Sequence, residues 1–331
     1  ATAWMVLTHW GEHHRFRTSF YLDESTHTLW IKGSGDPYLI SEELDVVARN
    51  IRQKGLTQIK AIGIDTSLFQ PNLLLPGTGT SDNPYDAVPT AVAANFNTVA
   101  IKTVDKQVVS AELITPLTAY AESLARLHRS RELRINTGPN PHNAETYFAE
   151  LLAAFLMKNG VAVASQIVFG QHPNKPVFYE HVNTKTLGEI LRSMLKYSTN
   201  FVANQLILVL SAEHFNRPAN ALDVKLYMED TLSRKFGWKG FVLEDGAGLS
   251  HNNLLSPKQL TELLLEFRKW KHLLPEIERG IYAKTGTLTG VSALAGYLVK
   301  GGNWQPFAIQ MNDPVPHNLR NRIALELFEH Q

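Results

Sequence analysis

Apolar residues recur every three to four positions in several stretches of the chain, which is the spacing of a helix that buries one face. The stretch that opens at Ser41 carries such a stripe and is closed by Gly55, a common helix stop. The apolar members of this stripe are Leu44, Val47, Ala48 and Ile51. The same spacing predicts helices over 147–156 and 187–210. The pattern therefore predicts long helices in both halves of the chain.

Further helical segments are predicted near the start of the chain and in its last quarter. Ser256-Pro257 is a helix start, because serine caps the first turn and proline fits its first position, and this helix is predicted to run to about Trp270. A final helix is predicted over about 318–329. Residues 1–7 are apolar but lack the basic region and the cleavage site of a signal peptide. They are interpreted as the tail of a buried helix.

Short apolar runs between turn residues predict strands. These runs are 58–65, 161–169, 281–285, 291–299 and 306–311. Pro, Gly, Ser and Asn dominate between about 70 and 87, which indicates a loop, and short strand-like runs follow to about 114. The last three strands follow one another closely, as antiparallel neighbours do. The pattern predicts an α+β chain with a mixed back half and a separate, more β-rich front half.

The composition is that of an ordinary globular protein long enough for two domains. Hydrophobic residues make up 44% and charged residues 19% of the 331, and the formal net charge is +1. This balance gives no electrostatic case for nucleic acid or for an anionic membrane. Cysteine is absent, which excludes disulfides, thiolate catalysis and Cys-ligated metals. No run of 18 apolar residues occurs, so no segment is predicted to span a membrane.

The sharpest chemical signal is Lys284-Thr285-Gly286-Thr287 at the end of a short apolar strand. Successive strand residues alternate faces, so Lys284 can point into a cleft while the open strand edge pairs with an extended peptide. Gly286 leaves room for the backbone of a ligand. Thr285 and Thr287 can donate hydroxyl hydrogen bonds to a substrate carboxylate, and Lys284 supplies positive charge for it. Taken alone, a surface lysine before a turn is the simpler interpretation.

A second signal lies inside the helical stretch 187–210, where Ser198 and Asn200 flank Thr199. Serine and asparagine are mediocre helix formers, because their side chains compete for backbone hydrogen bonds. Their spacing indicates a break between two helices that presents polar groups to a cleft. Taken alone, an ordinary joint between helices is the simpler interpretation.

Together the two signals point to one superfamily. Serine-x-x-lysine, serine-x-asparagine and lysine-threonine-glycine, in that order, mark penicillin-binding proteins and class A β-lactamases. The second and third motifs stand in this order at Ser198 and Lys284, and their surroundings resemble the penicillin-binding protein 4 type of D-alanyl-D-alanine carboxypeptidase/endopeptidase (low-molecular-mass class C). The segments that carry this resemblance are 283–291, 295–297, 244–250, 253–257, 33–37, 15–18 and 115–117. Ala247 departs from the pattern, since the family usually has serine there.

The resemblance implies the transpeptidase fold of penicillin-binding proteins and serine β-lactamases, an antiparallel sheet flanked by helices. Residues 1–20 and 139–331 are then expected to form the catalytic domain, and 21–138 an inserted β-rich accessory domain. The implied activity is that of a serine-type D-Ala-D-Ala carboxypeptidase/endopeptidase, which acts on peptidoglycan stem peptides through an acyl-enzyme, is inhibited by β-lactams and needs no cofactor. The implied location is the periplasm or the extracytoplasmic cell-wall space. Peripheral membrane contact and oligomeric state are left open.

Residue roles also follow from the resemblance. Ser198 would relay a proton toward the leaving amine, and Asn200 would hydrogen-bond the substrate amide and hold the catalytic lysine. Lys284 would keep that lysine neutral and attract the terminal carboxylate. The residues expected to bind substrate are Thr285, Gly286 and Thr287. The Thr287 N–H would be one of two oxyanion donors, the other being that of the nucleophilic serine.

The first motif is absent from its expected place. The family has it on a helix just before the segment matched by 1–18, so the nucleophile is expected a few residues upstream of Ala1 and the chain as given is expected to be inactive. Beginning inside an apolar helix favours a truncation over a natural loss. A literal match at 193–196 is rejected, because Ser193 lies five residues before Ser198 on the same helical segment. Residues 81–83 spell serine-aspartate-asparagine but lie in the Pro/Gly-rich loop.

No metal or nucleotide site is predicted. His9, His13 and His14 include a pair at helical spacing, yet no glutamate completes a His-Glu-x-x-His frame, so a solvent-facing cluster is the favoured interpretation. Asp36 after Gly35 is interpreted as a turn, because the helix that follows a dinucleotide fingerprint does not come directly after it.

Two other functions remain open from the sequence. A β-lactamase is the first, although no class A glutamate-x-x-leucine-asparagine segment is found and the long stretch between motifs argues against it. The second is a non-catalytic wall-binding protein that has lost its nucleophile. Deacylation rates distinguish the first alternative, and the sequence upstream of Ala1 distinguishes the second.

Overall fold

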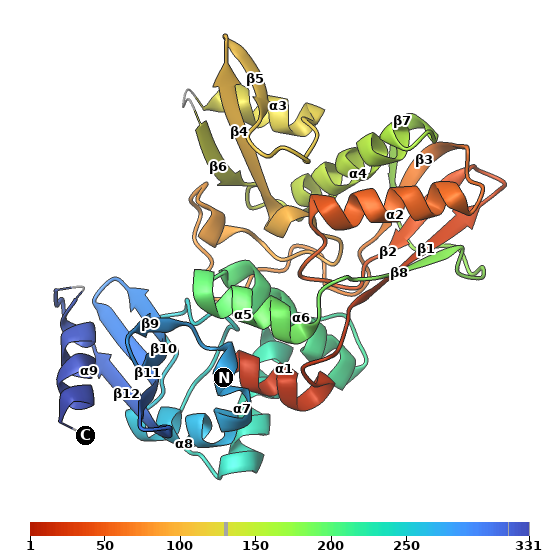
Figure 1. The fold of residues 1–331 in the computed structure, drawn as a ribbon. Coiled ribbons are helices and arrows are strands. Elements are labelled where there is room, and N and C mark those ends of the chain that lie inside the picture. The colour runs from red at the N-terminus through yellow and green to blue at the C-terminus, as the bar shows by residue number, and fades with distance from the viewer. Residues whose placement is uncertain (129–131, 317, 331) are drawn as a thin grey trace.

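The fold is known from a computed structural model that describes residues 1–128, 132–316 and 318–330. Figure 1 shows a part that holds α1, α5–α9 and the sheet β9–β12, and a second part that holds the remaining strands with α2, α3 and α4. The chain begins in the first part with α1, continues into the second part and returns to the first. Both termini therefore lie in the first part (Figure 1).

The last sheet of the chain is antiparallel, with strand order β12-β11-β10-β9. Its strands are β9 (Glu276–Glu278), β10 (Ile281–Leu288), β11 (Val291–Lys300) and β12 (Asn303–Met311). Helix α9 (Leu319–Glu329) packs on β11 and β10, and α8 (Pro257–Phe267) packs on β12. Pro306 is tolerated because β12 is an edge strand, where a missing N–H costs no ladder bond. The three long strands and both helices confirm the sequence prediction.

Helices form the core beside this sheet. They are α1 (Thr2–Trp10), α5 (Leu187–Tyr197), α6 (Asn200–Phe215), α7 (Ala221–Phe236) and the 3₁₀ helix η3 (Arg268–Leu273). Helix α6 is apolar almost all round, so it is buried on nearly every face and packs against α1, α5 and α7. Residues 2–7 are buried, which confirms the prediction of a buried helix at the start of the chain.

The second part contains a five-stranded sheet of order β7-β3-β2-β1-β8. Its strands are β1 (Arg17–Asp23), β2 (Thr28–Lys32), β3 (Gln58–Asp65), β7 (Ala162–Phe169) and β8 (Tyr179–Val182). Strand β3 pairs in parallel with both β2 and β7, and the other pairings are antiparallel. Helices α2 (Ser41–Gln53) and α4 (Pro141–Lys158) pack on each other and bury their apolar stripes against the sheet (Figure 1).

A smaller antiparallel sheet of order β5-β4-β6 lies at the far end of the second part (Figure 1). It consists of β4 (Thr98–Val104), β5 (Gln107–Ser110) and β6 (Glu132–Asn136), with α3 (Ala119–Leu127) beside β4. Between β3 and β4 runs a long loop, residues 66–97, which contains the 3₁₀ turns η1 (Pro84–Asp86) and η2 (Asn95–Asn97). The predicted loop over about 70–87 is confirmed.

The elements from 141 to 182 pack with the second part of the molecule. Helix α4, β7 and β8 share one hydrophobic core with α2, β1 and β3. The sequence placed these elements in the catalytic domain, on the other side of a boundary at residue 139. The domain division stays a prediction, and the shared core places α4, β7 and β8 with the module that was expected to end at 138. Within the described residues, no helix has the length and apolar character needed to cross a membrane.

Candidate functional site

The predicted break in the helical stretch 187–210 is confirmed. Helix α5 ends at Tyr197, and Ser198 caps it in the left-handed region with φ 55° and ψ 45°. Thr199 has extended backbone and precedes α6, which begins at Asn200. The reversal between the two helices leaves the Ser198 side chain exposed at their joint. Because this segment has a weak helix propensity, the helix is interrupted here and the Ser198 hydroxyl is exposed.

Lys284 reaches this hydroxyl from a different element. Its Nζ donates a hydrogen bond to Ser198 Oγ and a second one, 2.7 Å long, to the Thr285 carbonyl. Strand alternation turns Ala283 toward α9 and Lys284 to the opposite face of the sheet, where α5 meets α6. Burial lowers the pKa of Lys284, and the positive charge of Arg320 lowers it further. The structure thus brings the two motifs together.

Asn200 lies at the same joint but is bonded in another direction. Its Nδ2 donates to the Tyr85 carbonyl at 3.2 Å, so it connects the start of α6 to the loop 66–97. The expected contact of Asn200 with a catalytic lysine stays a prediction. Tyr85 is itself 54% exposed and was not singled out from the sequence. It was missed because no local pattern shows that this loop returns to Asn200.

Strand β10 offers an open edge beyond Lys284. Strand β9 pairs only with Ile281 and Tyr282, whereas β11 pairs along the whole of β10. From 284 to 288, β10 therefore has a single strand neighbour among the described residues. A Cβ on Gly286 would meet only the Ala293 Cβ, at 3.5 Å, so the space beside Gly286 is free of other protein atoms. This edge can pair with an extended peptide, as the sequence predicted.

Thr285 and Thr287 project from the face of β10 opposite to Lys284, by the alternation of the strand. The Thr287 hydroxyl accepts a hydrogen bond of 2.8 Å from Arg320 Nη1, and the Gly286 carbonyl accepts one of 2.6 Å from the same nitrogen. Arg320 was not predicted as a site residue. It lies in a correctly predicted helix, but the sequence gives no sign that an arginine of this helix is buried beneath β10.

The loop 244–250 fixes α6 beside the site. The Ala247 N–H donates to Asn204 Oδ1 on α6 at 2.9 Å, and the Thr2 hydroxyl of α1 donates to the Gly246 carbonyl at 2.6 Å. The buried Asp245 carboxylate closes the loop by accepting from the Leu249 and Ser250 N–H groups. The segment that carried part of the family resemblance therefore positions a helix and contributes no reactive group to the contact between Ser198 and Lys284.

The rejected motif matches lie elsewhere. Lys196 is exposed, with its Nζ over the Tyr197 ring at 5.3 Å, and no contact of Ser193 or Lys196 with Ser198 or Lys284 is found in the described part of the chain. The Ser81 hydroxyl donates to Asp86 within its own loop. His9 contacts Glu213 at 3.2 Å, and no group of three or more potential ligands for a metal occurs among the described residues.

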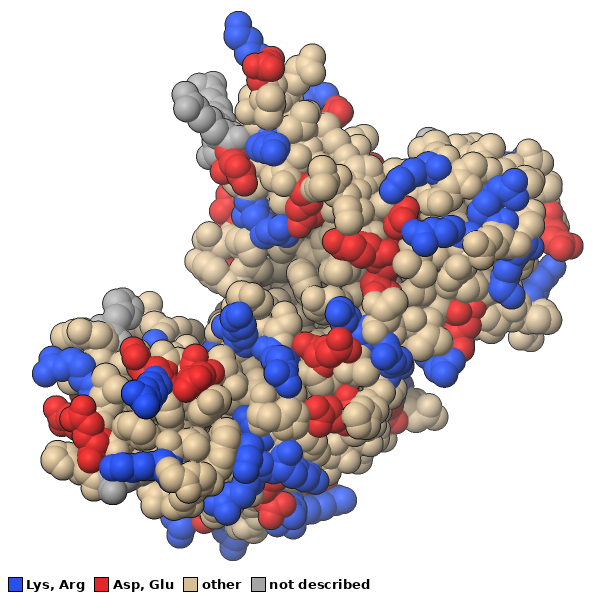
Figure 2. All heavy atoms as spheres, viewed as in Figure 1, with Lys and Arg blue, Asp and Glu red and all other residues tan. Residues whose placement is uncertain are grey.

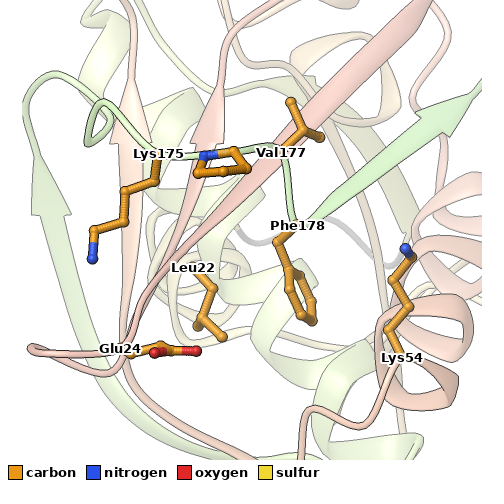
Figure 3. Close-up of a pocket in the computed structure, with 7 residues that line it drawn as sticks. Leu22, Glu24, Lys54, Lys175, Val177 and Phe178 are labelled. Atoms are coloured by element: carbon orange, nitrogen blue, oxygen red, sulfur yellow. The ribbon is translucent and has the colours of Figure 1, made fainter.

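The face of the molecule drawn in Figure 2 carries both signs of charge. Figure 2 shows lysines and arginines interspersed with acidic residues, and a face hollowed between the part with β4–β6 and the part with β9–β12. A separate hollow of about 500 Å³ lies on the second part of the molecule (Figure 3). It is lined by Leu22, Glu24, Lys54, Lys175, Pro176, Val177 and Phe178. None of these residues belongs to the two motifs, so this hollow is distinct from the site at Ser198 and Lys284.

Comparison with known families agrees with this geometry. The model of the D-Ala-D-Ala carboxypeptidase 3 (S13) family matches residues 1–278. This range includes Ser198 and Asn200 and ends before Lys284. A D-alanyl-D-alanine carboxypeptidase of Actinomadura sp. is 26% identical over 408 residues, which cover 99% of this chain and 75% of that protein. The D-alanyl-D-alanine carboxypeptidase DacB of Haemophilus influenzae is 27% identical over 182 residues, 47% of this chain and 38% of that one.

Solved structures show the fold. Penicillin binding protein 4 (dacB) from Haemophilus influenzae has a TM-score of 0.77 at 19% identity, over 99% of this chain and 89% of that one. A predatory peptidoglycan endopeptidase from Bdellovibrio bacteriovorus has a TM-score of 0.53 at 14% identity, over 99% and 82% of the two chains. The first of these similarities confirms the predicted fold class.

Proposed function

The chain belongs to the D-Ala-D-Ala carboxypeptidase 3 (S13) family, and from that premise we propose that it cleaves the D-alanyl-D-alanine end of peptidoglycan stem peptides through a serine ester. The observation that carries the proposal is the hydrogen bond from Lys284 Nζ to Ser198 Oγ. Two motifs far apart in the sequence meet there, next to the open edge of β10. Acyl transfer needs such a convergence of a proton relay and a cation on one point.

The nucleophile in this mechanism comes from the serine-x-x-lysine motif of the family. Three residues apart on a helix, its serine and lysine share one face, so the lysine amine can accept the serine proton during attack on the carbonyl of the penultimate D-alanine. We place this motif ahead of α1. The start of α1 lies against Gly246, and α1 packs on α5 and α6, which is a suitable approach to Ser198.

The groups on this chain assist formation of the serine ester, which water then hydrolyses to free the serine. The Ser198 hydroxyl passes a proton toward the leaving amine, and Lys284 repels a proton from the catalytic lysine and attracts the terminal carboxylate. Asn200 holds the substrate amide, which requires it to exchange its hydrogen bond to the Tyr85 carbonyl for one to substrate. The Thr287 N–H and the serine N–H bind the oxyanion, while Thr285 and Gly286 line the strand edge along which the peptide lies.

The same serine would be acylated by β-lactams and would deacylate slowly. A solved structure of a related protein agrees with this, since penicillin binding protein 4 from Haemophilus influenzae has been crystallised in complex with a novel β-lactam. A substrate in the cell wall places the protein in the periplasm or another extracytoplasmic space. Both the substrate and the location follow from the proposed chemistry.

Covalent labelling with a fluorescent penicillin tests the proposal. The protein would be produced with the serine-x-x-lysine motif ahead of Ala1, as wild type and as Lys284→Ala. Wild type should take up label, and Lys284→Ala should lose it by about 10²-fold or more in rate, because a charge that acts in a low-dielectric site is removed. Hydrolysis of an N-acylated D-alanyl-D-alanine, followed by release of D-alanine, measures turnover on the natural linkage.

Two matched variants provide the controls. Lys196→Ala removes an exposed lysine on the neighbouring helix, and Ser193→Ala removes the serine of the rejected motif match. Both variants should label at the wild-type rate. A folded wild type that takes no label would overturn the enzyme proposal, and loss of label in Ser193→Ala would show that the nucleophile has been assigned to the wrong segment. Rapid deacylation of the labelled wild type would instead favour a β-lactamase.

A further inference from the structure

The hollow in Figure 3 has no part in the reaction proposed above, because none of its residues belongs to the two motifs. It has a volume of about 500 Å³ and is formed by three segments that are distant in the sequence. Leu22 and Glu24 come from β1 and the turn after it, and Lys54 follows the last residue of α2. Residues 175–178 come from the loop that precedes β8. The proposed reaction does not explain why these segments converge.

The middle of the hollow is apolar. Leu22 and Phe178 are half-buried and pack on the core of the second part, whereas Val177 is 47% exposed. A ligand with apolar groups of its own removes such surface from water, and this burial favours binding. The apolar middle therefore favours a ligand with methyl or similar groups over one that is polar throughout.

Charged side chains surround this apolar surface. Lys54 and Lys175 lie on opposite sides of it (Figure 3). Lys54 forms no ion pair with a described residue, and Lys175 Nζ is 3.9 Å from its one such partner, Asp23 Oδ1. Both ammonium groups are therefore available to carboxylates of a ligand. Glu24, also without an ion pair among the described residues, disfavours a densely anionic ligand such as a polyphosphate.

The loop between β7 and β8 holds one wall of the hollow in a fixed conformation. The Lys175 N–H donates to the Pro173 carbonyl at 2.8 Å, and the Phe178 N–H donates to a carbonyl of β1 at 2.8 Å. Pro173 and Pro176 restrict the backbone on either side of Lys175. A wall that is already formed loses little conformational entropy when a ligand binds, so modest contacts are sufficient.

The substrate of the proposed reaction has the chemistry that this surface selects. A peptide that ends in D-alanyl-D-alanine carries methyl groups and a carboxylate, and peptidoglycan repeats its stem peptides along one polymer. When one stem peptide occupies the site at Ser198 and Lys284, others are tethered nearby. Binding of a second stem peptide is then intramolecular, and a weak site gains a high effective concentration of ligand.

We propose that the hollow between Lys54 and Lys175 is a second binding site, which holds a carboxylate-bearing stem peptide of polymeric peptidoglycan while another stem peptide is cleaved. This inference rests on the proposed function, because it takes the second ligand to be part of the same substrate. The site raises the affinity for the polymer and leaves the affinity for a short soluble peptide unchanged.

Sedimentation with purified insoluble peptidoglycan tests this site separately from catalysis. The full protein with its serine-x-x-lysine motif is used as wild type and as Lys54→Glu/Lys175→Glu, each with and without penicillin to block the active site. The double variant should bind the penicillin-treated polymer mixture about 10-fold more weakly, because two attractive contacts of exposed charges become repulsive. Wild-type binding should weaken as salt is raised. Hydrolysis of a soluble N-acylated D-alanyl-D-alanine should be the same in both proteins.

Lys106→Glu/Lys239→Glu is the matched control. Both lysines are exposed, neither lines the hollow, and the pair changes the net charge by the same amount. This variant should bind peptidoglycan as the wild type does. Peptidoglycan from which an amidase has removed the stem peptides is the control for the ligand, and the wild type should bind it about as weakly as Lys54→Glu/Lys175→Glu binds the intact polymer. Thermal midpoints close to that of the wild type show that the variants are folded.

The outcomes separate the two proposals. A wild type that neither hydrolyses the dipeptide nor takes up penicillin contradicts the proposed function, while sedimentation still reports on the hollow because it needs no turnover. Equal binding by the wild type and Lys54→Glu/Lys175→Glu contradicts the second site. An equal loss in Lys106→Glu/Lys239→Glu contradicts it too, since net charge alone would then attract the polymer. Full binding to the stripped glycan would show that the stem peptide is not the ligand.

Discussion

Ser198 combines an unfavourable backbone with a functional side chain. Its left-handed conformation costs a residue with a Cβ roughly 1–2 kcal/mol, and glycine is the usual residue at such a helix end. The chain has a serine there, and its hydroxyl accepts from Lys284 Nζ. Local propensity and the residue present disagree, which is expected where function rather than stability selects a side chain.

Replacing Ser198 should therefore separate stability from activity. Ser198→Gly should raise the free energy of unfolding by about 1 kcal/mol, because the left-handed conformation is no longer strained, whereas Ser198→Ala should leave it near the wild-type value. Both variants should lower turnover of an N-acylated D-alanyl-D-alanine by about 10²-fold or more, because the proton relay is gone. Urea denaturation and D-alanine release measure the two quantities. A glycine variant no more stable than the alanine variant would show that the strain is absent.

At the scale of single residues, the sequence identified those site residues that belong to short local motifs. Ser198 and Lys284 stand in short motifs whose chemistry is readable from neighbouring residue types. Arg320 belongs to no such motif. Its hydrogen bonds reach residues 28 to 34 positions away, across a helix–sheet interface. Arginine is rarely buried, so nothing in the sequence suggested that this one lies beneath a sheet.

At the scale of elements, periodicity predicted the segments that bury one face. Strand β3 was predicted with its observed bounds, because its apolar run is enclosed by polar and turn residues. Strand β9 was missed, since Glu276-Ile277-Glu278 has no apolar run and becomes a strand only by pairing with β10. Helix α7 was missed as well. Its Asn220 cap, its first-turn Asp223 and the helical spacing of Val224, Met228 and Leu232 are all present in the sequence.

The close packing of the loop 244–250 on α6 leads to a prediction about how this helix is positioned. A Cβ on Gly246 would lie 2.4 Å from the Ala203 carbonyl oxygen of α6, so Gly246→Ala must push the loop and the helix apart. It should destabilise the protein by about 1–3 kcal/mol, as overpacking does, and should slow penicillin labelling because α6 carries Asn200.

Gly170→Ala is the matched control for this change. Its Cβ would first meet the Trp30 ring at 3.4 Å, an ordinary contact, so the thermal midpoint and the labelling rate should stay close to those of the wild type. Thermal denaturation followed by circular dichroism gives the midpoints. Equal effects of the two substitutions would show that the approach of Gly246 to α6 does not position the helix.

At the scale of the whole molecule, pairing between distant segments decides the architecture. Strand β3 pairs in parallel with β7, about a hundred residues later, and α4 packs on α2. A sequence pattern records the faces of these elements but not their partners, so the front module was expected to end at 138 although its core continues to β8. The loop 66–97 was assigned to that module as well, yet it is bonded to the helices of the first part.

Those bonds predict that the two parts unfold together. Gln205 Nε2 on the buried face of α6 donates to the Thr90 carbonyl at 2.7 Å, Gln70 and Ala219 form a backbone hydrogen bond of 3.0 Å, and Asn200 contacts the Tyr85 carbonyl. Because these contacts are spread along the loop, the second part cannot unfold without breaking hydrogen bonds to α6. Differential scanning calorimetry should show one transition in which the calorimetric and van't Hoff enthalpies agree.

Gln205→Ala tests this connection directly. The Thr90 carbonyl loses its partner in a buried place, so the free energy of unfolding should fall by about 1–3 kcal/mol while the transition stays single. The control, Gln53→Ala, removes an exposed glutamine at the end of α2 and should change the midpoint little. Two resolved transitions in the wild type would mean that the loop does not couple the parts. The joint between α6 and the loop would then be too loose to keep Asn200 at a fixed distance from Ser198 and Lys284.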